Sequence, residues 1–219
     1  MLAPHGPGLQ RSDSVGAARV TRFRYGPARA EVLAYRGGLI SSVRRPLGAA
    51  GLAPFLVSFT ARATRLARRE RVEVIHAHWW LPAGLAGVPA GVASRAPLVI
   101  TCHGSDVELL RRPALGRLAR AVLGRAAVVG AVSGPLARTV EELTGLPVRV
   151  LRMPVDLASH LPPTVGPGPV PPLRLVTVGR LSREKGFDVA IAALARLAEE
   201  GVEVTLRVIG DGPERGSLV

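Results

Sequence analysis

The stretch Leu173-Arg-Leu-Val-Thr-Val-Gly-Arg-Leu-Ser-Arg-Glu-Lys-Gly186 joins an apolar run to a glycine and a basic turn. We expect residues 173–178 to form a buried strand, followed by a helix over 189–200 that is capped by Asp188. A second apolar run at 202–209 completes a parallel βαβ unit. Ligands of open α/β sheets bind where such strands end, so the basic turn is a candidate site.

The basic turn has the residue types that hold a phosphate group. Gly179 lets a phosphate approach the main chain, Arg180 offers two parallel N–H donors, and Lys185 adds a compact ammonium charge. Lys185 is the only lysine among the 29 Lys and Arg residues of the chain. An ordinary basic turn without a ligand is the alternative, and the turn alone does not decide between the two.

The N-terminal part alternates strand-like apolar runs with helical patterns. The expected strands cover 72–78, 97–102 and 126–132, and the expected helices cover 55–71, 82–94 and 114–125. Buried strands that alternate with helices predict an α/β fold, with a Rossmann-like parallel sheet that carries helices on both faces. Ser133 is expected to cap a further helix that stops at Gly145.

Residues 161–172 divide the chain. Their prolines exclude helix and sheet interiors and predict a stiff, extended linker. The linker separates a domain over 1–160 from a C-terminal part over 173–219. Because one βαβ unit has too few strands to close a core, we expect the C-terminal part to be an incomplete second Rossmann-like domain.

The net charge of +13 makes nucleic acid and anionic membranes candidate partners. Arginines on two of the expected helices give basic faces beside apolar ones, which could rest on anionic lipid. These are Arg62, Arg65, Arg68, Arg69, Arg111, Arg112, Arg117, Arg120 and Arg125. Solvated helix faces and a coding bias toward arginine explain the same charge, and nucleic acid is the less favoured partner.

The cellular compartment is predicted from cysteine usage and hydropathy. A single cysteine, Cys102, excludes an internal disulfide and fits a reducing cytosol. The uncharged stretches 46–61 and 74–94 are interrupted by Pro and Gly, so neither is expected to cross a membrane. We therefore expect a cytoplasmic protein, with the inner face of the membrane as a place of contact.

Two other patterns do not support the chemistry that they suggest. His76 and His78 share one face of a strand, as metal ligands do, but no third ligand is apparent, so no metal is expected. Gly210-Asp-Gly-Pro-Glu-Arg-Gly216 has one residue more than a dinucleotide-binding fingerprint, so no nicotinamide cofactor is expected. Trp79 and Trp80 fit either a sugar-stacking surface or the core.

The segments Val178-Gly-Arg-Leu-Ser-Arg-Glu-Lys-Gly-Phe-Asp-Val-Ala-Ile-Ala-Ala-Leu194 and Val208-Ile-Gly-Asp-Gly-Pro213 resemble the family-4 glycosyltransferases. Four N-terminal segments resemble the same family: His76-Ala-His-Trp-Trp-Leu-Pro82, Thr101-Cys-His-Gly-Ser-Asp106, Ala131-Val-Ser133 and Arg152-Met-Pro-Val-Asp156. The resemblance implies the GT-B architecture of two Rossmann-like domains. It covers a nearly complete acceptor domain and the first part of the donor domain.

The resemblance also implies roles for individual residues. Gly179, Arg180 and Lys185 match positions that hold the donor diphosphate, where preorganised cations stabilise the leaving group. His103 matches a histidine that faces the donor sugar and that we take as the catalytic residue. The remaining residues expected at the substrate cleft are His78, Gly104, Asp106 and Ser133.

Relatives contain segments that this sequence lacks. The residues before His5 look like the end of a second strand, so a first strand and its glycine-rich loop are expected to be missing. A glutamate pair of the donor domain has no counterpart either. We therefore expect a fragment that binds a nucleotide sugar weakly or not at all.

Two functions follow from the sequence. The first is transfer of a hexosyl group from a nucleotide sugar to a hydroxyl group of a glycan or lipid-linked acceptor, with retention at the anomeric carbon and without a cofactor. The alternative is a non-catalytic basic module that binds nucleic acid or an anionic membrane surface.

Overall fold

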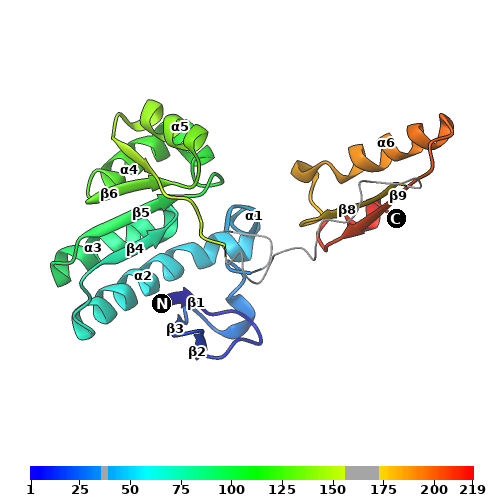
Figure 1. The fold of residues 1–219 in the computed structure, drawn as a ribbon. Coiled ribbons are helices and arrows are strands. Elements are labelled where there is room, and N and C mark those ends of the chain that lie inside the picture. The colour runs from blue at the N-terminus through cyan, green and yellow to red at the C-terminus, as the bar shows by residue number, and fades with distance from the viewer. Residues whose placement is uncertain (36–38, 156–172) are drawn as a thin grey trace. The chain divides into compact units, whose positions relative to one another are not determined.

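The computed structural model describes residues 1–35, 39–155 and 173–219 (Figure 1). The chain divides into two compact units, Met1–Val155 and Asp156–Val219. The predicted linker over 161–172 lies outside the described residues.

A four-stranded parallel sheet forms the centre of the first unit. Its strands are β4 (Ile75–His78), β5 (Leu98–Cys102), β6 (Val128–Ala131) and β7 (Val148–Val150), and they lie in this order. The first three fall within the predicted runs, whereas β7 has no predicted counterpart. The alternation of strands and helices is the one expected, and the α/β prediction is confirmed.

Helices α3 (Leu85–Ser94), α4 (Pro113–Leu123) and α5 (Gly134–Thr144) connect the strands of this sheet. The predicted limits of α5 are confirmed: Ser133 Oγ accepts the Leu136 N–H at 3.4 Å, and Gly145 ends the helix with φ of 72°. Short helical turns complete the connections. They are Ala28–Ala30, Trp80–Gly84 and Glu108–Arg111 in this unit, and Arg183–Lys185 and Arg215–Ser217 in the second.

The prediction for the long helix before β4 is wrong at its start. Helix α2 covers Pro46–Arg69, and a short helix α1 (Leu39–Val43) precedes it. Proline at the first helical position has no N–H to leave unsatisfied, so Pro46 begins the helix well. Pro54 lies inside α2 and did not end it, as a sequence rule would suggest. No described helix has the length and apolar run needed to cross a bilayer.

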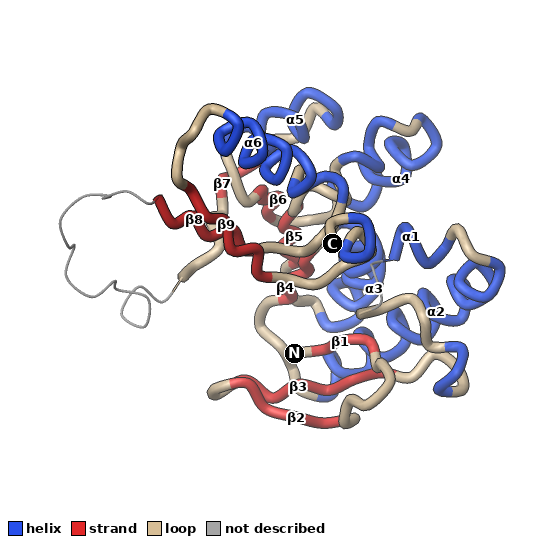
Figure 2. The backbone as a smooth tube through the Cα atoms, turned by 90° about the vertical axis from the view of Figure 1, so that its right-hand side faces the viewer, coloured by secondary structure: helices blue, strands red, loops and turns tan. Residues whose placement is uncertain are grey.

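A second, smaller sheet precedes α2. It consists of β1 (Leu2–Pro4), β2 (Ser12–Val15) and β3 (Ala18–Phe23) in the order β1-β3-β2, with β1 parallel and β2 antiparallel to β3. Figure 2 shows the two sheets in one row, in which β1 follows β4. Aromatic packing fixes this sheet against α2: the rings of Phe23 and Phe59 stack at 4.7 Å, and Tyr25 meets Phe55 edge-on at 4.9 Å.

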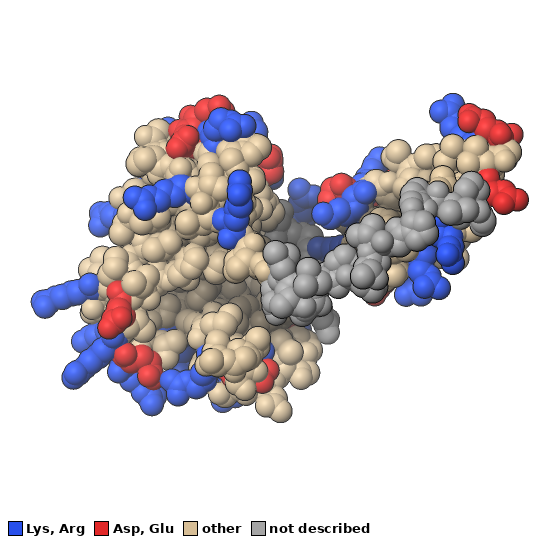
Figure 3. Space-filling view, viewed as in Figure 1, with Lys and Arg blue, Asp and Glu red and all other residues tan. Residues whose placement is uncertain are grey.

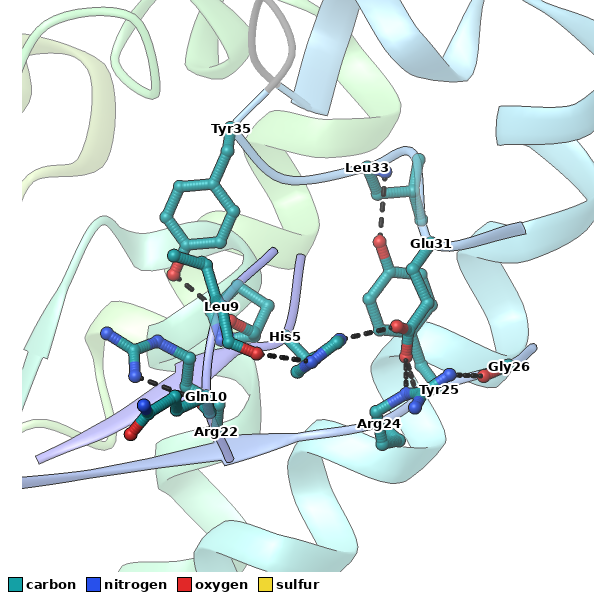
Figure 4. A network of polar contacts seen from close by, with 11 residues as sticks. His5, Leu9, Gln10, Arg22, Arg24, Tyr25, Gly26, Glu31, Leu33 and Tyr35 are labelled. Carbon is teal, nitrogen blue, oxygen red and sulfur yellow. Dashed lines mark hydrogen bonds and ion pairs between the residues drawn. The ribbon is translucent and has the colours of Figure 1, made fainter. Parts of the chain in front are cut away.

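A buried carboxylate holds the chain around the smaller sheet together (Figure 4). Glu31 has no exposed surface, and its two oxygens accept from Arg24 Nε at 2.7 Å and from the Tyr25 N–H at 3.1 Å. His5 Nδ1 lies 2.7 Å from the same carboxylate, and His5 Nε2 lies 2.9 Å from the carbonyl oxygen of Leu9. Glu31 therefore connects three separate segments.

The hydrogen bonds to Glu31 outweigh its burial. Burial alone would raise the pKa of the carboxyl, but the bonds from Arg24, His5 and the Tyr25 N–H lower the pKa below its ordinary value. The ionised form is therefore the one that the fold stabilises.

The second unit contains one βαβ unit. Strands β8 (Leu173–Val178) and β9 (Val204–Ile209) pair in parallel, and α6 (Phe187–Glu199) connects them. The predicted cap is wrong. Gly186, with φ of 65°, is the N-cap, and Asp188 lies in the first turn without a capping hydrogen bond. Glycine allows this left-handed geometry, so the helix begins before Asp188.

We predict that Glu31→Gln destabilises the first unit by about 3 kcal/mol at neutral pH, because Arg24 and His5 lose the carboxylate that they share. Urea unfolding followed by tryptophan fluorescence measures this, since both tryptophans lie in this unit. The exposed Glu73→Gln is the matched control and should change little.

The same variant tests the pH dependence. The folded pKa of Glu31 lies below the reference value of 4.5, so its contribution is complete above pH 4.5 and is lost as the pH falls through the folded pKa. The stability difference between wild type and Glu31→Gln should therefore shrink in acid. A difference that stays constant from pH 7 to strongly acidic pH would contradict the role given to this carboxylate.

Candidate functional site

The carboxyl ends of β4 and β5 bring two of the predicted residues together. His78 is the last residue of β4 and pairs in register with Thr101, and His103 follows the end of β5. His78 Nδ1 lies 2.9 Å from His103 Nε2, so one of these nitrogens donates and the other accepts. The ring of His76 lies 4.4 Å from that of His78, and its Nε2 lies 2.8 Å from Thr101 Oγ1.

This clustering disfavours protonation of the histidines. Burial lowers the pKa of His103, the charge of His78 lowers it further, and Asp106 acts in the opposite direction. Burial and the charges of His78 and His103 likewise lower the pKa of His76. At neutral pH the group therefore offers imidazole rings that can both donate and accept hydrogen bonds to hydroxyl groups.

Asp106 holds the loop after β5 from below. It is buried, and Oδ1 accepts from the main-chain N–H of His103 at 2.9 Å and of Gly104 at 3.1 Å. Oδ2 accepts from the Trp80 N–H at 3.1 Å. The carboxylate thus ties the loop after β4 to the loop after β5, and its role is to position the loops. The prediction had Asp106 in the cleft itself.

The two tryptophans have different environments. Trp80 is fully buried and donates its ring N–H to the carbonyl oxygen of Asp106 at 2.7 Å, which makes it a core residue. Trp79 is 41% exposed and meets the ring of His103 edge-on at 6.3 Å. Only Trp79 therefore offers a surface on which a sugar could stack.

Gly104 and Ser133 lie at the same edge of the sheet. Gly104 has φ of 116°, a conformation that other residues rarely adopt, and its N–H is the one held by Asp106. Ser133 follows β6, is exposed, and uses its hydroxyl to cap α5. The structure prints no contact between Ser133 and the histidines. Within the described part of the chain, no group of His, Cys, Asp and Glu side chains is arranged to hold a metal ion.

The predicted diphosphate-binding residues lie on the turn between β8 and α6. Gly179 directly follows β8, and Arg180 and Lys185 are exposed on the turn. The pKa of Glu184 is lowered by hydrogen bonds from its own N–H and the Ser182 hydroxyl, and then by the charges of Arg180 and Lys185. Both cations therefore act on the same small region of the turn.

Main-chain packing shapes this turn. A Cβ at Gly210 would lie 1.9 Å from the Gly179 carbonyl oxygen, and one at Gly212 would lie 2.1 Å from that of Leu181. The Leu181 N–H also donates to the Asp211 carbonyl at 3.0 Å. The segment after β9 is thus in direct main-chain contact with the turn that carries the cations. The glycine pattern rejected as a dinucleotide fingerprint has this role.

The comparison with protein families is consistent with this arrangement. Residues 17–159 match the model described as Glycosyltransferase Family 4, and residues 168–219 match the model described as Glycosyl transferases group 1.

Three curated relatives illustrate the similarity. TuaC of Bacillus subtilis (strain 168), a glycosyltransferase whose name assigns it provisionally to teichuronic acid biosynthesis, is 31% identical over 67% of this chain and 39% of its own length. The 2-deoxystreptamine glucosyltransferase of Streptomyces kanamyceticus is 27% identical over 75% of this chain and 48% of its own. The glycogen synthase of Mycobacterium tuberculosis (strain ATCC 25618 / H37Rv) is 31% identical over 69% and 39%. The chain spans less than half the length of each.

Solved structures share the fold. Anabaena Alr3699/HepE in complex with UDP-glucose superposes with a TM-score of 0.58 at 19% identity, over 88% of this chain and 47% of that protein. The same protein with UDP and glucose gives a TM-score of 0.56 at 21% identity.

We predict that Asp106→Asn destabilises the first unit by about 2 kcal/mol, because an amide loses the charge and one of the two accepting oxygens. Urea unfolding with Trp80 as the fluorescent probe measures the change. Glu108→Gln in the same loop is the control, since its exposed ion pair with Arg111 at 3.4 Å contributes little. An equal effect of both variants would contradict the role assigned to Asp106.

We also predict that His78→Ala raises the pKa of His103, because it uncovers the His103 ring and removes a neighbouring charge. Titration of the His103 ring protons by NMR measures this. His5, in the smaller sheet, is the internal control and should titrate as before. An unchanged His103 titration would show that the two rings are not coupled.

Proposed function

Because the chain belongs to Glycosyltransferase Family 4, we propose that it transfers a hexosyl group from a nucleotide sugar to a hydroxyl acceptor with retention. In this reaction the bond from the anomeric carbon to the diphosphate breaks, and a bond to the acceptor oxygen forms on the same face of the sugar. The acceptor hydroxyl loses its proton, and the diphosphate leaves with the electron pair.

The observation that carries the proposal is the cationic turn of the second unit. It follows a parallel strand and precedes a helix, which is where open α/β sheets bind ligands. Arg180 and Lys185 are exposed there, and the amino-terminal end of α6 adds a favourable dipole. We propose that these groups and the Gly179 main chain bind the donor diphosphate and stabilise the charge that develops on it.

The histidine cluster of the first unit is the proposed site for the sugar and the acceptor. His103 would orient sugar hydroxyls or the acceptor, with His78 bonded to its ring. Because the pKa of His103 is lowered, chiefly by burial, a neutral ring is the reacting form. We propose Gly104 and Ser133 as neighbours of the substrate. No cofactor or metal has a step in this proposal.

The acceptor is proposed to be a glycan or a lipid-linked hydroxyl compound. A lipid-linked acceptor would bring the protein to the inner face of the cytoplasmic membrane, where arginines of α2 and α4 could meet anionic headgroups. Cytoplasmic localisation is part of the same proposal.

The alternative is a non-catalytic basic module. On the face of the first unit in Figure 3, the Lys and Arg side chains are separated by uncharged surface and by acidic residues. Several arginines also have acidic partners, such as Arg19 with Glu70 at 3.4 Å. Nucleic acid binding favours continuous basic surface along the phosphates, so this face gives the alternative little support.

Binding of UDP and of inorganic pyrophosphate to the chain tests the proposal. We expect NMR shifts at Gly179, Arg180, Lys185 and Gly186, with Lys185→Ala weakening the affinity about tenfold or more, since a charge-assisted hydrogen bond contributes about 1.5–3 kcal/mol. The exposed Arg196→Ala, on the last turn of α6, is the matched control and should bind like wild type.

Equal loss in both variants would indicate unspecific attraction of anions. A steep salt dependence of duplex DNA binding, insensitive to Lys185→Ala, would favour the alternative function.

A further inference from the structure

A groove of about 850 Å³ separates the two sheets of the first unit. Strand β1 lines one side, strand β4 the other, and helices α2 and α3 contribute apolar side chains. These include Leu2, Phe55, Phe59, Ala63 and Ala77. Figure 2 shows β4 and β1 facing each other as the end strands of their sheets.

The main chain of β4 has an unpaired edge toward this groove. The N–H groups of Ile75 and Trp79 donate to main-chain oxygens of β5 at 3.0 and 2.8 Å. Main-chain groups alternate in direction along a strand, so those of His76 and His78 point to the opposite edge. Within the described residues, no strand pairs with that edge.

Strand β1 presents the complementary edge. The Met1 carbonyl oxygen and the His5 N–H each bond to β3 at 2.9 Å, so the main chain of Leu2 points away from β3. On that side the Pro4 carbonyl accepts the Tyr35 hydroxyl at 3.0 Å. β1 and β4 run in the same direction in Figure 1.

We propose that the groove is a strand-binding site. Its occupant is an extended apolar polypeptide segment of about five residues, supplied from outside residues 1–219, that pairs in parallel with β1 and β4 at once. Two open edges on either side of one apolar groove match the two rows of main-chain donors and acceptors of a central strand. A small apolar molecule would leave both rows unpaired. A central parallel strand is apolar on both faces, as this lining requires.

The occupant would also reach the candidate site. Carboxyl ends of parallel strands lie at one edge of a sheet, and His78 and His103 line the groove. Residues that follow the bound strand would therefore emerge beside these histidines and form a further wall of the cleft. This inference does not depend on the reaction proposed above.

The test uses the whole 219-residue chain and a soluble synthetic peptide with an apolar core of about five residues. On binding, we expect hydrogen exchange at the His76, His78 and Leu2 amides to slow about tenfold or more. The Ile75 and Trp79 amides, already bonded to β5, are internal controls. Unchanged exchange at His76 and His78 would overturn the proposal.

Two methylated peptides decide how the segment binds. Each carries N-methyl groups on one of the two alternating sets of amides, so one loses its bonds to β1 and the other its bonds to β4. We expect each to bind about tenfold more weakly or worse than the parent. Full affinity of either would mean pairing with one edge only, and equal affinity of all three would mean a simple apolar pocket. Both results overturn the proposal.

A groove-filling variant provides an independent control. Ala63→Phe on α2 places a ring in the groove and should abolish peptide binding, whereas Ala61→Phe, two residues away and outside the lining, should not. Unchanged tryptophan fluorescence of Ala63→Phe would confirm that it folds, and the methylated peptides keep the test valid if it does not. Sedimentation that shows dimers lost in Ala63→Phe would overturn the proposal in favour of a second copy.

Discussion

The histidine cluster depends on one buried carboxylate. Asp106 accepts main-chain N–H groups from the loops after β4 and β5, and these loops carry Trp79 and His103. Without that anion the two loops would each need another partner for buried donors, since a buried N–H without one is costly. The 2.9 Å contact between His78 and His103 is therefore a product of a residue that faces away from any substrate.

The smaller sheet repeats this principle at larger scale. Glu31 joins the residue after β1, the chain after β3 and its own segment through three donors. Aromatic packing of Phe23 on α2 then sets the sheet beside β4. Buried acidic groups and apolar contacts together determine where the edges of the two sheets stand, and so determine the width of the groove.

Sequence patterns predicted the parallel elements well because each has its own local signal. Runs such as 97–102 are apolar throughout, and Ser133 and Gly145 mark the ends of a helix by local hydrogen bonding and backbone conformation. The start of α2 and the cap of α6 were predicted wrongly. In both, a neighbouring residue that suits the first turn, Pro46 or Gly186, took the place of the expected one.

The site was predictable only in part. The position of His103 after an apolar run indicated the edge of the sheet, but its bond to His78 depends on the register between β4 and β5. No pattern distinguishes a carboxylate that points down, such as Asp106, from one that points into a cleft. The pairing of His5 with Glu31, 26 positions apart, is equally invisible without the tertiary structure.

The contact between Gly179 and Gly210 has a consequence for how this part of the molecule can diversify. Main chain touches main chain there, so no side chain separates the two loops. The path of the segment that carries Arg180 is therefore insensitive to which residues decorate α6. Surface substitutions along that helix could retune electrostatic attraction while the cation-bearing loop keeps its shape, a division of labour that lets ligand preference and folding vary separately.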